Sequence, residues 1–527
     1  MRRHAYCGMP PGDPTVEPTA PDVEAAPSGR LPSAAAGPLP TWVAYALVFG
    51  TSAAVLVLEI TSLRLIAPYV GITLETNTAV IGLALTAIAI GAWSGGAAAD
   101  RLPPRSTIGP LLLIGGAFVL VVTPAIRLAA AAAGPADAAP IAILVATATV
   151  FVPAAVLSAV PPMVVKLELA SLTETGSVVG RLSGVSTIGA IVATFATGFV
   201  LVAVVPTSVI LTGTGALLVL GGLAFVVANR RRGIPPRVRV AAPLVLALAA
   251  GLGGAVVASP CQVETRYHCA SVLTDPARPG GRTLLLDTLR HSYVDTSDPT
   301  YLEFGYMKTF AAALDTRAAG PLDVLHVGGG GMTLPRYLLA SRPDSSNRVV
   351  EIDAGVVEID RARLALPDDP RLQVQVADGR TAVRQLAPDR FDVYVGDAFG
   401  GVAVPWHLTT RETFLDVDRV LRPDGLVVLN VIDYRSLDFA RAELATIASV
   451  FEHAALLTYN GGLNGGNLVL LASHAPIDRA AMTAALQDHG APMALVSEDD
   501  VRSFLGDDPL VLTDDHAPVD QLLTTSR

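Results

Sequence analysis

The chain has 527 residues, of which 51% are hydrophobic and only 16% are charged. About a quarter of the residues in a soluble domain carry charge, so this composition argues against an ordinary cytosolic enzyme. The charge is also uneven: residues 41–258 hold eleven Lys and Arg against six Asp and Glu, whereas residues 259–527 hold 23 against 37. The acidic C-terminal half argues against non-specific nucleic-acid binding, and we expect no nucleic-acid partner.

Residues 1–40 are rich in Pro, Ala and Gly and contain no apolar run. Such a segment cannot bury enough surface to offset the entropy of ordering, and it lacks the apolar stretch of a signal peptide. We interpret it as a disordered, cytoplasmic tail.

Seven apolar stretches of membrane-spanning length follow within residues 41–258. A helix needs roughly 20 apolar residues to cross a bilayer, and buried helices of a soluble core would not explain so few charges. The pattern predicts an all-α membrane domain whose partner is the lipid bilayer. The predicted spans are 41–65, 77–98, 108–128, 139–160, 181–205, 207–228 and 240–258.

The distribution of Lys and Arg predicts the orientation of these spans. With a cytoplasmic N-terminus, nine basic residues fall in cytoplasmic loops, and only Arg64 and Arg127 fall at the outer ends. Seven spans then place residues 259–527 outside the cytoplasm, whereas one span more or fewer would reverse this. We expect a multi-pass cell-membrane protein with an extracytoplasmic C-terminal domain.

Two further features accompany the membrane half. Cys261 and Cys269 lie just past the last span, in CQVETRYHC, and favour a disulfide if the compartment is oxidising; the alternative is a pair of free thiols. Glu59 lies within the first span, where ionisable groups are usually functional or paired. Arg64 follows five residues later, about 140° around a helix, which does not favour an intrahelical pair.

The C-terminal half divides into three predicted segments. Residues 259–318 indicate a small β-rich domain, residues 319–475 alternate between strand and helix, and residues 476–527 form an extension. The alternation predicts a mostly parallel sheet with helices on both faces, whose ligands bind outside the carboxyl ends of the strands. The predicted strands are 324–327, 348–352, 372–376, 391–395 and 426–431, and the helices are 332–340, 355–364, 381–386, 410–421 and 440–451.

Two loops at the carboxyl ends of predicted strands indicate a nucleoside site. Gly328, Gly329 and Gly330 follow a strand and precede a helix, so the backbone can approach a ligand closely. Glu351 stands at the end of the next strand, 21 residues after Gly330, an offset that suits a carboxylate on the hydroxyls of a ribose. The alternative is a tight turn beside a solvated acid.

Two more loops carry acids in the same positions. Asp378 and Gly379 stand where a carboxylate and a bare backbone can contact an adenine edge, although Asp378 is also a suitable helix N-cap. Asp397 follows a buried strand in YVGDAFGG and can accept a proton from an attacking nucleophile. The alternative role for Asp397 is that of a turn former.

The order GGGG, EID, DGR, GDAFGG and HLTTRETF resembles that of the spermidine synthase (polyamine aminopropyltransferase) family. EITSLRLIAPYVG, GGAAADRLP and GRLSGVSTIGAIVATFATGFVL resemble the membrane segment of its membrane-fused relatives, so the similarity covers residues 41 to about 475. It implies an α/β class I methyltransferase-like (Rossmann-like) domain behind a small β domain. It also implies a decarboxylated S-adenosylmethionine-type co-substrate, an amine acceptor and no prosthetic group.

The same resemblance implies roles for individual residues. Glu351 would hold the ribose hydroxyls, Asp378 and Gly379 would hold the adenine, and Asp397 would be the base for the acceptor amine. His291 stands where the family has a donor-binding Gln.

The chain departs from the family pattern where a polyamine would bind. Where the family has GGGDG, this chain has Gly331 at the position of the Asp. Where the family has DSSDP, this chain has Asp397-Ala398-Phe399-Gly400. The family's YHE motif is aligned with Glu303-Phe304-Gly305. A cationic polyamine needs carboxylates to replace its lost water, and at least two are missing. Three interpretations remain open: an aminopropyl or related transferase, a non-catalytic nucleoside- or amine-binding module, and a transporter with a regulatory soluble domain. A homo-oligomer is possible under each.

Overall fold

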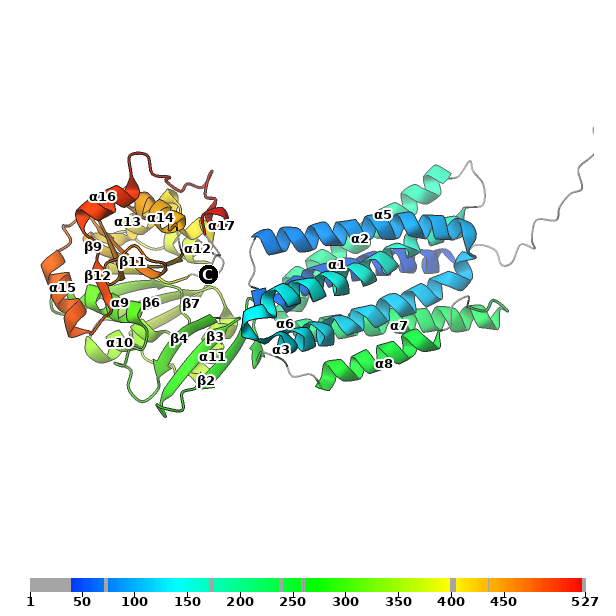
Figure 1. Ribbon diagram of the computed structural model, residues 1–527, viewed down its shortest axis with the longest axis horizontal. Coiled ribbons are helices and arrows are strands. Elements are labelled where there is room, and N and C mark those ends of the chain that lie inside the picture. Colours follow the sequence, from blue (N-terminus) through cyan, green and yellow to red (C-terminus); the bar gives the residue numbers. More distant parts are fainter. Residues whose placement is uncertain are drawn as a thin grey trace, which may run out of the picture.

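The computed structural model divides into a bundle of long helices and a C-terminal α/β domain joined by a small sheet (Figure 1). This agrees with the predicted fold class. The predicted tail, residues 1–40, lies almost wholly outside the described residues. The structure describes residues 39–70, 74–169, 175–236, 240–256, 259, 261–287, 289–398, 404–434 and 436–523.

The helical half contains, within its described residues, six helical segments long and apolar enough to cross a membrane. The predicted seventh stretch, 240–258, forms the shorter helix α8, whose apolar part is Ala241–Gly253. The helices are α1 (Thr41–Val70), α2 (Leu74–Arg101), α3 (Pro104–Ser158), α4 (Val160–Glu168), α5 (Thr175–Phe195), the π-helical η2 (Ala196–Leu201), α6 (Val202–Val204), α7 (Thr207–Arg231) and α8 (Ala241–Val256).

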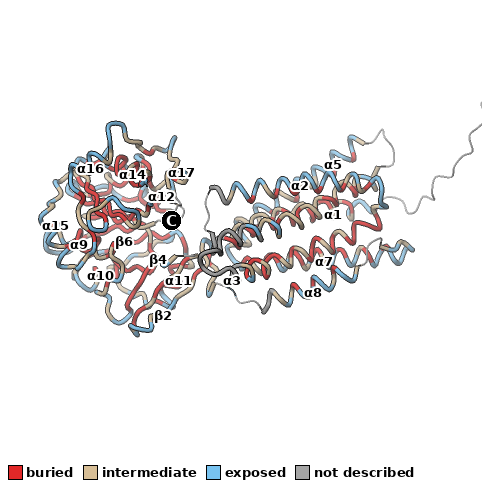
Figure 2. Tube along the Cα trace, viewed as in Figure 1, coloured by how far each residue is buried: buried red, intermediate tan, exposed pale blue. Residues whose placement is uncertain are grey.

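Small residues allow these helices to pack closely. A Cβ on Gly91 of α2 would lie 2.2 Å from the carbonyl oxygen of Ala155, and one on Gly189 of α5 would lie 2.5 Å from that of Phe49. Large apolar side chains such as Phe199 and Leu217 are instead exposed on the outside of the bundle, and Figure 2 shows exposed stretches along α5 and α8. An exposed apolar surface of this extent is suited to lipid rather than to water.

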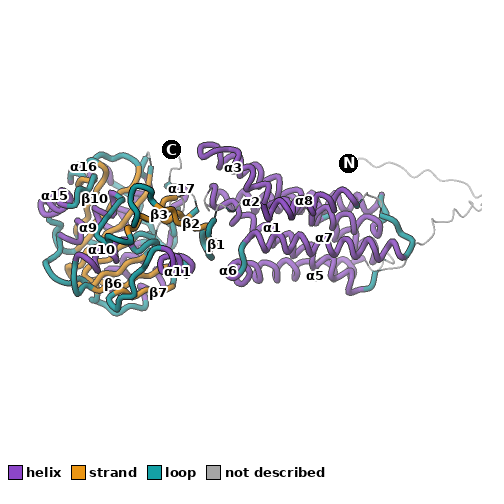
Figure 3. The backbone as a smooth tube through the Cα atoms, turned by 90° about the horizontal axis from the view of Figure 1, so that it is seen from below, coloured by secondary structure: helices purple, strands orange, loops and turns teal. Residues whose placement is uncertain are grey.

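A small antiparallel sheet in the order β1-β2-β3-β4 lies between the helical bundle and the larger sheet (Figure 3). It corresponds to the predicted β-rich segment, although helix α9, within the same predicted segment, packs with the larger domain. The strands are β1 (Val263–Glu264), β2 (Cys269–Thr274), β3 (Gly281–Leu286) and β4 (Leu289–Asp295).

The larger sheet has eight strands in the order β12-β10-β11-β9-β8-β5-β6-β7. The five strands from β7 to β9 are parallel and match the predicted ones, whereas β11, β10 and β12 are antiparallel. The sheet is therefore mixed. Its strands are β5 (Asp323–Val327), β6 (Ser346–Glu351), β7 (Leu372–Val376), β8 (Phe391–Gly396), β9 (Leu421–Asp433), β10 (His453–Tyr459), β11 (Gly466–Ser473) and β12 (Met493–Leu495).

Helices cover both faces of this sheet because its strands carry apolar residues on both sides. Val324 packs with α9, α10 and α15, whereas its neighbour Leu325 packs with α12, α13 and α14. The helices are α9 (Gly305–Asp315), α10 (Thr333–Ser341), α11 (Ala354–Arg363), α12 (Gly379–Arg384), the 3-10 helix η3 (Trp406–Leu408), α13 (Arg411–Val420), α14 (Asp438–Ala448), α15 (Arg479–Asp488), α16 (Glu498–Leu505) and α17 (Val519–Leu522).

The segment after residue 475, predicted as an extension, is built into the same domain. β12 pairs with β10, and Arg380 of α12 makes a two-pronged ion pair with Asp514, with both N–O distances 2.7 Å. The parallel order β7-β6-β5-β8-β9 places the predicted site loops along one edge of the sheet.

Candidate functional site

The glycine loop after β5 makes close backbone contact with the loop after β8. Gly328 adopts a φ of +102°, and a Cβ at this position would lie 2.2 Å from the carbonyl oxygen of Asp397. Only glycine combines this conformation with this contact. The predicted glycine loop after β5 and the predicted Asp397 loop after β8 therefore meet at the centre of the sheet edge.

Glu351 at the end of β6 is held by two backbone N–H groups. Its Oε2 accepts from the N–H of Gly329 at 2.7 Å, and its Oε1 accepts from that of Asp353 at 2.9 Å. Burial raises the pKa of the Glu351 carboxyl, while these two hydrogen bonds oppose the rise. Each carboxylate oxygen has a further lone pair, so an oriented Glu351 can still accept from two ribose hydroxyls.

His291 reaches the glycine loop from strand β4 of the small sheet. A Cβ on Gly330 would lie 2.3 Å from His291 Cδ2, so ring and loop are in contact. Burial lowers the pKa of His291 to about 4, which leaves the ring neutral at pH 7. A neutral ring can donate one hydrogen bond and accept another.

Asp378 is the N-cap of α12, which was the alternative role for this residue. One oxygen accepts from the N–H of Thr381 at 2.9 Å, and the other is 3.0 Å from Nε2 of His407. Burial raises the pKa of Asp378, but these hydrogen bonds outweigh it and bring the pKa below its ordinary value. Gly379, the next residue, packs against the end of β5, where a Cβ would lie 2.6 Å from Cγ1 of Val327.

Asp397 receives two side-chain hydrogen bonds. Asn430 of β9 donates to its Oδ1 at 2.9 Å, and the hydroxyl of Tyr306 donates to its Oδ2 at 3.2 Å. Asn467 of β11 in turn donates to Oδ1 of Asn430 at 2.9 Å. Burial raises the pKa of Asp397 to about 6, against the opposing effect of the two donors. A carboxylate with this pKa is ionised at pH 7, and its pKa lies close enough to 7 for it to serve as a base.

Sequence reasoning missed Tyr306, Asn430 and His407. Tyr306 lies directly after Glu303-Phe304-Gly305, the segment aligned with the YHE motif, so the sequence singled out its neighbours and not the residue itself.

The predicted departures have structural counterparts. Gly331 lies against strand β4 of the small sheet, where a Cβ would be 2.2 Å from Oγ of Ser292, and its N–H donates to buried Asp360 at 3.0 Å. Gly400, where the family has its second acid, lies outside the described residues.

Two further predicted features are the Cys261–Cys269 pair and Glu59 on helix α1. Cys261 and Cys269 form a disulfide with an S–S distance of 2.07 Å. Glu59 lies half-buried on α1, and Arg64 hydrogen-bonds to carbonyls of the small sheet rather than forming the pair considered for Glu59.

In a comparison with known protein families, residues 303–457 match the model of the spermine/spermidine synthase domain. The polyamine aminopropyltransferase of Pyrobaculum calidifontis is 34% identical over 158 residues, which cover 28% of this chain and 52% of that protein. The eEF1A lysine and N-terminal methyltransferase of Bos taurus is 30% identical over 141 residues, 25% of this chain and 20% of that protein.

Among solved structures, a probable spermidine synthase from Corynebacterium glutamicum is similar, with 29% identity and a TM-score of 0.45, covering 49% of this chain and 97% of that one. The chain spans about half the length of the curated polyamine aminopropyltransferases it matches. By its match to the family model and to these curated relatives, the region around residues 303–457 is spermidine synthase-like, as its motifs predict.

Proposed function

We propose that this spermidine synthase-like domain transfers an aminopropyl or related group from a decarboxylated S-adenosylmethionine-type donor to an amine. The observation that carries the proposal is the setting of Asp397. It stands at the centre of the sheet edge, beside the glycine loop, with two side-chain donors on its oxygens and a pKa raised to about 6.

The nucleoside part of the donor would occupy the loops after β5, β6 and β7. Glu351 would accept the ribose hydroxyls while Gly329 and Asp353 hold its oxygens in place. Gly379 and the Asp378–His407 pair border the position proposed for adenine. His291, neutral at pH 7, would border the nucleoside from strand β4 of the small sheet, beside the glycine loop.

In the proposed reaction the acceptor nitrogen attacks the donor carbon that is bonded to the sulfonium. The N–C bond forms as the C–S bond breaks, and the electron pair of that bond stays on sulfur, which leaves neutral 5′-methylthioadenosine. Asp397 takes the proton that the nitrogen loses. Tyr306 and Asn430 fix the carboxylate so that its base function needs no reorganisation.

The acceptor would differ from a simple polyamine. The described partners of Asp397 are the neutral Tyr306 and Asn430, and Gly331 replaces the acid of the glycine loop. A second ammonium group would therefore lose its water without a carboxylate to replace it. We expect slow or absent turnover of putrescine.

The test is to follow methylthioadenosine release by the full-length protein in detergent, with decarboxylated S-adenosylmethionine and a panel of amines. Asp397→Asn should reduce turnover roughly 10²–10⁴-fold while methylthioadenosine binding is retained, and exposed Asp389→Asn should leave turnover unchanged. A wild-type protein that neither binds methylthioadenosine nor turns over any amine would contradict the proposal. Binding without turnover would support the non-catalytic module instead, and brisk putrescine turnover would contradict the altered acceptor.

A further inference from the structure

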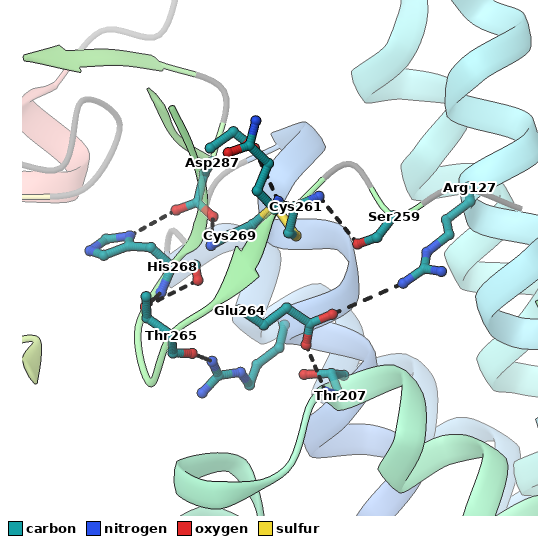
Figure 4. Close-up of a disulfide and its surroundings, with 12 residues drawn as sticks. Arg127, Thr207, Ser259, Cys261, Glu264, Thr265, His268, Cys269 and Asp287 are labelled. Atoms are coloured by element: carbon teal, nitrogen blue, oxygen red, sulfur yellow. Dashed lines mark hydrogen bonds and ion pairs between the residues drawn. A yellow bond between two sulfur atoms is a disulfide. The ribbon is translucent and has the colours of Figure 1, made fainter. Parts of the chain in front are cut away.

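The β1–β2 hairpin is inserted between the membrane helices and the nucleoside-binding domain (Figure 4). The disulfide joins Cys261, which lies just before β1, to Cys269, the first residue of β2. The tip between the two strands contains Glu264, Thr265 and His268. The hydroxyl oxygen of Thr265 accepts from the N–H of His268 at 2.8 Å, which tightens the tip. The hairpin thus presents fixed side chains to both of its neighbours.

On one side the tip contacts three membrane helices. Glu264 accepts from the backbone N–H of Thr207, the first residue of α7, at 2.7 Å, and it lies 4.0 Å from Arg127 of α3. Arg64 of α1 donates to the carbonyl of Thr265 at 2.7 Å and also to that of Arg266. The backbone at Thr265 is therefore held from the membrane side.

On the other side Thr265 contacts the loop that follows β6, which carries Glu351 and Asp353. Its hydroxyl donates to Oδ2 of Asp353, a fully buried carboxylate whose other oxygen accepts from the N–H of Gly355 at 2.9 Å and so caps α11. The backbone N–H of Asp353 is one of the two donors that hold Glu351. A Cβ on Gly355 would lie 2.7 Å from Cγ2 of Thr265, so hairpin and loop are in tight contact.

We propose that Thr265 is a positioning residue for the nucleoside site, through which Arg64 of α1 and the contacts of Glu264 with α3 and α7 set the orientation of Glu351. The inference rests on the proposed function, in which Glu351 holds the ribose. The chain of contacts is continuous from α1 to Thr265, Asp353 and Glu351. Thr265 is 6% exposed and acts without touching the ligand.

The experiment measures the Kd of 5′-methylthioadenosine for the full-length protein by calorimetry. Thr265→Val, which keeps the shape and removes the hydroxyl, should raise the Kd about tenfold, the effect of losing one hydrogen bond to a charged group. Thr265→Ser should restore it. Exposed Thr274→Val on β2 is the matched control and should leave the Kd unchanged.

A second pair of variants tests the membrane side. Arg64→Gln should raise the Kd about threefold or more. Arg266→Gln should not, because only the backbone carbonyl of Arg266 is used. In a Glu351→Gln background, Thr265→Val should add almost nothing, since both substitutions act on the same carboxylate.

The outcomes separate this inference from the proposed function. A wild-type protein without affinity for methylthioadenosine would remove the nucleoside site itself. Normal wild-type binding with an unchanged Kd in Thr265→Val, or full additivity with Glu351→Gln, would overturn only the positioning role. If Thr265→Val fails to fold, Arg64→Gln carries the test, and an unchanged Kd in that variant would overturn the positioning role.

Discussion

Two hydrogen-bond donors and burial act in opposite directions on the proton affinity of Asp397. Burial raises its pKa, whereas Asn430 and Tyr306 lower it, with a result of about 6. The ionised form is needed to accept a proton, so kcat/KM should fall as the pH drops below about 6. This acidic limb is the expected signature of Asp397 as the base.

Tyr306→Phe should move that limb to higher pH. The Tyr306 hydroxyl stabilises the ionised carboxylate, so its removal raises the pKa of Asp397 and reduces the active fraction at pH 6–7. The measurement is a pH profile of methylthioadenosine release. Tyr301→Phe, which removes a hydroxyl bonded to Glu303 instead, should leave the profile in place; an unshifted limb in Tyr306→Phe would argue that another group titrates.

Glu351→Gln should weaken methylthioadenosine binding far more than Glu358→Gln. Both acids lie on or beside α11, but Glu351 is 8% exposed and accepts from two backbone N–H groups, whereas Glu358 is exposed. A hydrogen bond to a charged group contributes about 1.5–3 kcal/mol, so the Kd should rise at least tenfold. Equal small effects, measured by calorimetry on folded variants, would count against the ribose role.

At the scale of residues, the sequence predicted the side chains at strand ends and missed their supporting partners. Glu351 and Asp397 could be found because each directly follows an apolar run. Tyr306 lies on a helix 91 positions before Asp397, and Asn430 lies inside a strand. Their contacts with Asp397 arise from tertiary packing, which no local pattern encodes.

At the scale of elements, Gly328→Ala provides a test of the glycine loop. Gly328 and Gly320 both have φ above +100°, but a Cβ at 328 would strike the Asp397 backbone while one at 320 meets open space. Gly320→Ala should cost about 1–2 kcal/mol of stability from its conformation alone. Gly328→Ala should cost more and also reduce turnover, because it displaces Asp397. Denaturant unfolding and turnover assays check both, and equal effects of the two variants would contradict the contact.

The alternation of strand and helix predicted the five parallel strands within a few residues, but not the antiparallel edge. β10 and β11 are joined by residues 460–465, a loop that begins Asn460-Gly461-Gly462 and in which Asn460 and Gly461 have positive φ. This was an available hairpin signal. Their pairing with β9 and β12 was not available, since it depends on which edge of the sheet remains open.

In the whole molecule, the C-terminal domain lies at one end of the helical bundle (Figure 1). Glu264 bonds to Thr207 at the start of α7, and α7 ends at Arg231. At about 1.5 Å per residue, its 25 residues exceed the roughly 30 Å hydrocarbon core. In a membrane-spanning α7 the two ends would fall on opposite membrane faces, whether or not α8 counts as a span.

We accordingly predict that Arg230–Arg232 face the cytoplasm and that residue 300 faces outward. Basic residues prefer the cytoplasmic side, and a disulfide at Cys261 is suited to an oxidising compartment. In a Cys7→Ser background, Thr300→Cys should react with a membrane-impermeant maleimide in intact cells, whereas Arg232→Cys should react only after permeabilisation. The inverse pattern would place the domain in the cytoplasm. Labelling of both positions in intact cells would contradict the opposite placement of the two ends of α7 itself.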